Sequence, residues 1–159
     1  MLEFCGQENI VLEGNGRIRL PRQWVEDFMR HGNGEVVIHG LPEGAVAIYP
    51  EEVYRAMRTR ELGDLDRAGG SFAARRSMRR FGALTAVDQL SAQGRVTLPE
   101  AFREYAGLIS GSKVRVVGVE IGLEIWETGR FNAEMAAADE EMQRKREAEF
   151  SVVNGDPVP

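Results

Sequence analysis

A short pattern, Gly-Arg-x-x-Leu-Pro, occurs twice in this chain, at residues 16–21 and 94–99. After the glycine, polar and apolar residues alternate in both copies. An extended backbone would therefore place Arg17 and Arg19 on the face opposite Ile18. The proline that closes each copy suits the start of a helix, where its missing N–H is not needed. Each copy predicts a short strand that buries its aliphatic face, exposes its arginine and leads into a helix.

The same order of elements surrounds each copy. The two halves align at an offset of 78 residues up to Gly40 and Gly118, and at 77 after one gap. Asn15-Gly16 between apolar runs is a strong hairpin signal, so segments 10–13 and 17–20 are predicted to pair with each other. The other predicted strands are 35–39, 45–49, 84–90, 95–98, 113–118 and 123–126, and predicted helices begin near Pro21, Pro50, Phe72, Pro99 and Glu127.

This internal duplication predicts how the domains are organised. A unit as small as one half buries little surface and is marginal alone. We therefore expect the halves to pack into one pseudo-symmetric body, with two independent domains on a linker as the alternative. The predicted parts are a first repeat over 1–61, a connector with a basic segment over 62–82, a second repeat with the C-terminal helix over 83–149, and a mobile tail over 150–159.

The last predicted helix carries an apolar stripe. Phe131, Met135, Ala138 and Met142 are spaced by 4, 3 and 4 residues. Such heptad-like spacing fits either packing against the helix's own domain or a coiled coil.

Composition sets the class of protein and its compartment. The 159 residues are 43% hydrophobic and 28% charged, as in ordinary globular proteins. The single cysteine, Cys5, rules out an internal disulfide. Apolar runs are too short to cross a bilayer, and the N-terminus lacks the layout of a signal peptide. We expect a cytoplasmic protein that does not contact membranes.

The net charge of −5 is unevenly distributed. Residues 1–81 contain twelve basic and twelve acidic groups, whereas residues 82–159 contain eight and thirteen. Residues 73–81 hold four arginines and no acid. Almost every basic residue is arginine, whose planar fork donates two hydrogen bonds to one phosphate. An arginine excess of this kind also arises from genome composition.

Catalytic and metal-binding patterns are missing from the sequence. The two histidines, His31 and His39, have no serine or cysteine nucleophile in a recognisable motif near them. No paired cysteine or histidine spacing suits zinc, and no glycine-rich loop has a phosphate-binding spacing. We expect neither enzyme activity, nor a cofactor, nor a small-molecule substrate.

A duplicated strand with arginine at its tip suits a repetitive anionic partner, and double-stranded DNA is one. A two-stranded ribbon fits the major groove. Arg17 and Arg95, with Asn15 and Gln93 in the turns, would supply donors to phosphates and base edges. The alternative is that both arginines pair with nearby acids such as Glu13 and only brace the hairpin.

Several stretches together resemble one known family. Residues 90–99, 102–108 and 123–126, preceded by the arginine-rich 74–80, have the order and spacing of the MraZ family of bacterial transcription regulators, within the AbrB-like swapped-hairpin barrels. The resemblance spans roughly residues 1–148. It implies an α+β fold in which duplicated β-hairpin/helix units form a pseudo-twofold small β-barrel with flanking helices. It also implies a homo-oligomeric ring that binds promoter repeats of the division and cell-wall gene cluster.

The chain departs from the family pattern at the turns. The family has an aspartate four residues before each arginine. Here Glu13 stands before Arg17, and Ser91 stands before Arg95. Asn15 replaces the usual turn lysine.

These observations predict a nucleoid-associated DNA-binding regulator that assembles with itself. A protein-interaction module that has lost DNA binding is the alternative. The predicted main contacts are Arg17 and Arg95, the supporting contacts are Arg19, Asn15, Gln93 and Thr97, and a secondary strip comprises Arg75, Arg76, Arg79 and Arg80. For that strip, helix capping or inter-subunit ion pairing explains the residues equally well.

Overall fold

The computed structural model describes residues 2–62 and 69–153, and the chain divides into two units, Met1–Glu127 and Thr128–Pro159. The described residues form an α+β fold with five helices. The strands are β1 (Gln7–Val11), β2 (Arg17–Arg19), β3 (Glu35–Gly40), β4 (Val46–Pro50), β5 (Thr85–Gln89), β6 (Arg95–Thr97), β7 (Lys113–Gly118) and β8 (Leu123–Trp126). The helices are α1 (Arg22–Met29), α2 (Glu51–Leu62), α4 (Phe72–Ala83), α5 (Glu100–Ala106) and α6 (Thr128–Val153).

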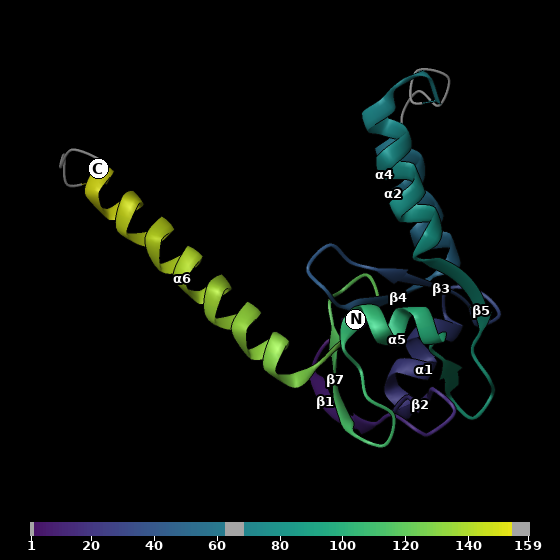
Figure 1. Cartoon of the computed structure of the whole chain (residues 1–159). Coiled ribbons are helices and arrows are strands. Elements are labelled where there is room, and N and C mark those ends of the chain that lie inside the picture. The colour runs from purple at the N-terminus through teal and green to yellow at the C-terminus, as the bar shows by residue number, and fades with distance from the viewer. Residues whose placement is uncertain (1, 63–68, 154–159) are drawn as a thin grey trace. The chain divides into compact units, whose positions relative to one another are not determined.

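Six strands form one antiparallel sheet in the order β1-β7-β8-β4-β3-β5. The first strand of each half pairs with the third strand of the other half, β1 with β7 and β5 with β3. The registers are equivalent, because Gln7 lies opposite Val117 and Thr85 lies opposite His39. The two halves of the chain therefore share a single sheet (Figure 1).

The predicted hairpin between segments 10–13 and 17–20 is wrong. The turn itself forms, since the Gly16 N–H donates to the Glu13 carbonyl at 2.9 Å. Its two arms then separate, and β2 pairs with β6 in a second, two-stranded sheet. The physical reason is burial: Ile18 and Val96 lie opposite each other in this pairing, and both are buried. Each three-residue strand thereby covers the apolar side chain of its counterpart.

The pairings among the described residues leave β1 and β5 as edge strands of the six-stranded sheet. These strand pairings do not close the sheet into a barrel. The swapped-hairpin barrel implied by the family resemblance therefore stays a prediction.

Both halves contribute to one hydrophobic core. The aromatic residues that follow the two Gly-Arg-x-x-Leu-Pro copies, Trp24 in α1 and Phe102 in α5, are buried there. Pro21 and Pro99 stand immediately before these helices, as predicted. Other core residues come from every part of this unit and include Phe4, Leu12, Phe28, Ile38, Ile48, Leu98, Val116, Leu123 and Ile125.

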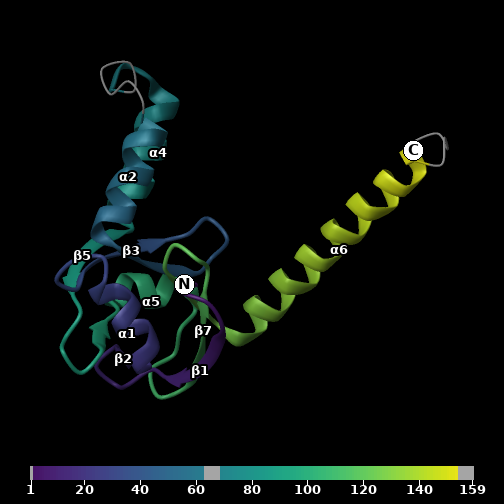
Figure 2. The ribbon, with the colours of Figure 1, turned by 180° about the vertical axis from the view of Figure 1, so that it is seen from behind.

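Helices α2 and α4 run side by side and project from the sheet, as both views show (Figures 1 and 2). Ser71 begins α4 by accepting a hydrogen bond from the Ala74 N–H at 3.2 Å. The connector predicted over 62–82 therefore contains an ordered basic helix, while residues 63–68 lie outside the described part of the chain.

Helix α6 forms most of the second unit. It ends at Val153, four residues beyond the predicted helix end at residue 149, and the rest of the predicted tail lies outside the described residues. Met135 and Met142 of its apolar stripe are 46% and 56% exposed. No helix in the described part of the chain is long and apolar enough to span a membrane.

Candidate nucleic-acid interface

The ribbon of β2 and β6 has one apolar face and one polar face. Ile18 and Val96 point into the core, whereas the neighbours on either side of each are exposed. The register places Arg19 opposite Arg95, and Arg17 opposite Thr97. Side chains directly opposite each other in an antiparallel pair have Cβ atoms about 4.5–5.5 Å apart. Three guanidinium groups and a hydroxyl thus gather on one exposed face.

The three guanidinium groups of this face have no partner in the part of the chain that the structure describes. Within residues 2–62 and 69–153, Arg17, Arg19 and Arg95 form no side-chain hydrogen bond or ion pair. The alternative in which Glu13 braces Arg17 is therefore not what the structure shows. Like charges directly opposite each other across a sheet are destabilising. A bound anion would relieve this repulsion.

The turns before the two arginines need glycine. Gly16 and Gly94 have φ of +84° and +82°, in the left-handed region. A Cβ on Gly16 would lie 2.9 Å from the Leu98 carbonyl oxygen, and one on Gly94 would lie 2.7 Å from Cγ2 of Val25. The chain crosses the end of the partner strand too closely for any side chain.

Side chains in the turns fix the backbone of each arginine. Oδ1 of Asn15 accepts a hydrogen bond from the Arg17 N–H at 3.1 Å, and Oγ of Ser91 accepts one from the Arg95 N–H at 2.9 Å. The residues that depart from the family pattern therefore still orient both arginines. Asn15 and Gln93 are exposed beside the arginine face.

The predicted secondary strip lies on α4, at the end of this unit away from β2 (Figure 2). Arg80 has hydrogen-bond partners within the molecule: it donates to the Tyr105 hydroxyl at 2.7 Å and to the Gly40 carbonyl at 3.3 Å. Arg75 donates to the Gly69 carbonyl at 3.1 Å, and Arg76 lies over the Phe72 ring. These contacts give Arg80 an intramolecular role, in which it fixes α4 against Tyr105 and the end of β3. The strip and the ribbon are separate surfaces.

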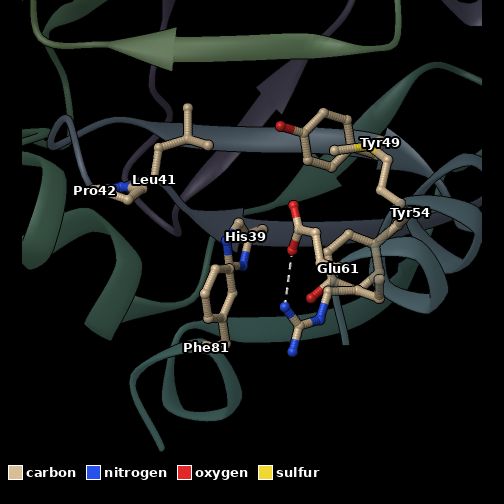
Figure 3. Close-up of a pocket in the computed structure, with 9 residues that line it drawn as sticks. His39, Leu41, Pro42, Tyr49, Tyr54, Glu61 and Phe81 are labelled. Atoms are coloured by element: carbon tan, nitrogen blue, oxygen red, sulfur yellow. Dashed lines mark hydrogen bonds and ion pairs between the residues drawn. The ribbon is translucent and has the colours of Figure 1, made fainter. Parts of the chain in front are cut away.

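A cavity of about 200 Å³ lies between the α2–α4 pair and the sheet (Figure 3). Aromatic rings surround it, and the Phe81 ring stacks on the His39 imidazole at 5.0 Å. Nη1 of Arg58 pairs with Oε2 of Glu61 at 3.0 Å. The other residues that line it include Leu41, Tyr49, Tyr54 and Met57.

His39 and Tyr49, two of the residues that line this cavity, favour their neutral forms. Burial lowers the pKa of His39, and the positive charges of Arg80 and Arg58 lower it further. Burial also raises the pKa of Tyr49 to about 12. Nδ1 of His39 lies 2.9 Å from Oγ1 of Thr85, which holds the ring in place. No sequence pattern marks this cavity, because its walls combine residues of β3, β4 and α2 with Phe81 of α4, and their meeting depends on the tertiary fold.

His31 links three segments of the first unit. Its Nε2 lies 2.5 Å from a Glu3 carboxylate oxygen, and its Nδ1 lies 2.8 Å from a Glu52 carboxylate oxygen. The hydrogen bond to Glu3 raises the pKa of His31 most, burial opposes it, and Glu52 adds to the increase. His31 therefore ties the N-terminal segment and the first turn of α2 to the end of α1. Across the described residues, no three His, Cys, Asp or Glu side chains are grouped to hold a metal ion.

Comparison with known proteins gives a consistent result. Residues 85–152 match the family described as "MraZ protein, putative antitoxin-like". A Transcriptional regulator MraZ of Corynebacterium glutamicum (strain R) is 32% identical over 153 residues, which cover 96% of this chain and 95% of the relative. The Transcriptional regulator MraZ of Paenarthrobacter aurescens is 30% identical over 160 residues, which cover 98% of this chain and 97% of the relative.

A third relative, the Transcriptional regulator MraZ of Marinobacter nauticus, is 28% identical over 154 residues, covering 93% of this chain and 98% of the relative. The similarity thus extends over nearly the whole length of both proteins. The resemblance inferred from the sequence is confirmed, and the chain belongs to the MraZ family.

Proposed function

We propose that this protein is a sequence-specific DNA-binding transcriptional regulator that contacts DNA through the β2–β6 ribbon. The observation that supports this most directly is the exposed face on which Arg17, Arg19 and Arg95 have no partner among the described residues. The relatives' names, which describe transcriptional regulators, agree with it.

The ribbon has the dimensions and chemistry for this task. The major groove, about 12 Å wide, admits a two-stranded ribbon, and arginine pairs with guanine edges and phosphates through two hydrogen bonds. Arg17 and Arg95 are the proposed main contacts. Asn15, Gln93 and Thr97 can donate to and accept from base edges or phosphates, and the remaining arginine of the face, Arg19, strengthens the positive field.

We further propose that the protein acts as a homo-oligomeric ring. One ribbon offers few phosphate contacts, so a monomer would bind weakly at physiological salt. Several protomers on repeated promoter sites gain affinity from effective concentration. The proposed target is the promoter of the division and cell-wall gene cluster, and the proposed location is the cytoplasm, on the nucleoid. A closed pseudo-twofold barrel is the proposed scaffold for the ribbon.

Replacing Arg95 by alanine tests DNA binding. Losing one arginine–base pair is expected to lower specific affinity by about 1–3 kcal/mol, whereas losing a phosphate contact should flatten the plot of log K against log [salt] by about 1 per engaged protomer. Fluorescence anisotropy with a duplex of the promoter upstream of the protein's own gene, and with a scrambled duplex, measures both. Arg60→Ala, which removes an exposed arginine on α2, is the matched control.

Sedimentation analysis tests the proposed oligomer. The mass of the particle should be a multiple of the 17.7 kDa of one chain.

An oligomeric protein-interaction module is the second candidate, and Glu13 and Ser91 at the family's aspartate positions favour it. The exposed Met135 and Met142 on α6 would suit a protein partner. Under this alternative, the wild-type protein would show no salt-dependent affinity for either duplex.

A further inference from the structure

The two ends of the β2–β6 ribbon are equivalent in backbone but not in side chains. Ile18 lies opposite Val96, which is also its equivalent in the second half of the chain. A pseudo-twofold axis therefore passes between them and exchanges the two ends. We name them the Arg19 end, where Arg19 lies opposite Arg95, and the Arg17 end, where Arg17 lies opposite Thr97.

Positive charge is concentrated at the Arg19 end. Beside its two opposed arginines stands Arg22, the first residue of α1, whereas the equivalent first residue of α5 is Glu100. The Arg17 end carries further acids. Asp88 accepts a weak hydrogen bond from the Thr97 N–H at 3.4 Å, and Glu13 lies in the adjoining turn, where the Arg19 end has Ser91.

Shape distinguishes the ends as well. A hollow of about 530 Å³ opens beside the Arg19 end, and it is lined by Arg19, Leu20, Arg22, Val25, Glu26, Ala92 and Gln93. At the Arg17 end the equivalent of Val25 is Arg103. Its Nε donates to the Leu98 carbonyl at 3.0 Å, and its Nη1 donates to the Ser110 hydroxyl at 3.2 Å.

The side chain of Arg103 therefore occupies space at the Arg17 end. Its Nε would lie only 2.9 Å from a Cβ placed on Gly16. The equivalent side chain of Val25 lies just as close to Gly94, with its Cγ2 2.7 Å from a Cβ placed there, but it is shorter and carries no hydrogen-bonding group.

Arg22 is available to a ligand. Its side chain is 92% exposed, and its one partner in the described part of the chain is Glu26, one turn later in α1, at 3.1 Å. An ion pair between exposed side chains contributes little and exchanges easily for another anion. Arg22 and Arg19 line the same hollow from two elements, so one phosphate group could accept hydrogen bonds from both.

We infer that this hollow binds a phosphate of the DNA backbone through Arg22 and Arg19, and that the Arg17 end has no equivalent phosphate site. The inference rests on the proposed function, since it places a second contact beside the ribbon. Arg22 thereby becomes a DNA-binding residue that the duplicated motif does not contain. The two ends of the ribbon would contact the DNA unequally, so each protomer would bind in one orientation.

Substitution of Arg22 tests the inference against a control that removes the same ion pair. Arg22→Ala should lower the slope of log K against log [salt] by about 0.9 per engaged protomer on both the promoter duplex and the scrambled duplex. Glu26→Ala also breaks the Arg22–Glu26 pair but leaves the guanidinium, so it should keep the wild-type slope. Glu100→Ala, at the equivalent position of the other end, should keep that slope too.

Three results would overturn the inference. An unchanged slope in Arg22→Ala, with a reduced slope in Arg95→Ala, would remove the phosphate site and leave the proposed function intact. An equal loss in Arg22→Ala and Glu26→Ala would assign the effect to the stability of α1. If the wild-type protein shows no salt-dependent affinity, the proposed function fails and the phosphate site fails with it.

Discussion

Single residues at the turns decide whether the ribbon can form. Gly94 combines a positive φ with a close approach to the Val25 side chain and the Leu20 carbonyl. A positive φ strains any residue that has a side chain, and the close approach leaves no room for one, so the two features together explain why glycine stands before both arginines. Alternation of residue types then determines which side chains emerge on the exposed face.

Gly94→Ala is expected to destabilise the protein by about 1–3 kcal/mol, because it combines left-handed strain with a clash at 2.7 Å. Urea denaturation followed by circular dichroism measures the loss. Gly82→Ala is the control: a Cβ there meets nothing within 4 Å, and the residue lies in α4. That change should be neutral or stabilising by up to about 1 kcal/mol, as expected for helical glycine. Equal stability of the two variants would contradict this account of the turn.

Between elements, His31 acts as a pH-dependent link. Its pKa is raised in the folded protein, so folding favours the protonated ring that donates to Glu3 and Glu52. The resulting stability is fully present below the unfolded pKa of 6.5, and it is lost as pH rises through the higher folded value.

The melting temperatures of wild type and His31→Gln should therefore differ most below pH 6.5 and converge as pH rises above the folded pKa. Thermal unfolding in matched buffers from acid to alkaline pH measures this difference. A gap that is constant with pH, or that widens toward alkaline pH, would show that the imidazolium does not link these segments.

Strand positions were predictable where residue patterns are local, and so was the pairing of neighbouring strands such as β3 with β4, but partners from the other half of the chain were not. The predicted strands 113–118 and 123–126 coincide with β7 and β8, because their apolar runs are bounded by turn residues. The Asn15-Gly16 turn also forms, yet it does not make its two arms pair. Partner choice depends on where the apolar faces are buried, which involves residues of the other half of the chain.

The candidate site likewise has features that the sequence predicts and features that it does not. Exposure of Arg17 and Arg95 follows from the alternation of residue types along each strand. The position of Arg19 opposite Arg95 does not follow from this alternation, because it requires the pairing of two strands 78 residues apart. On α2, Tyr54 lines the cavity, although no sequence pattern marks it for that place. The α4 helix, which supplies the other wall, has no pattern that specifies its contacts.

For the whole molecule, the shared sheet predicts that neither half folds as a monomer. Fragments 1–61 and 83–149 would each lack the strands that pair with their own, since β1 needs β7 and β5 needs β3. Each fragment should be unfolded or self-associated, because equivalent registers allow a half to pair with its own copy. Mixing the two should restore cooperative unfolding, as followed by circular dichroism and sedimentation. A folded monomer of either fragment would support two independent domains instead.

Because the two halves are covalently joined, the two ends of the β2–β6 ribbon can diverge from each other in sequence. In a complex of two identical chains, any substitution appears on both sides of the symmetry axis, so a gain at one side is copied at the other. Here Arg19 corresponds to Thr97, and Val25 corresponds to Arg103, within one polypeptide. A single gene can thus vary either side independently, and a directional surface can arise on a scaffold whose backbone has no direction of its own.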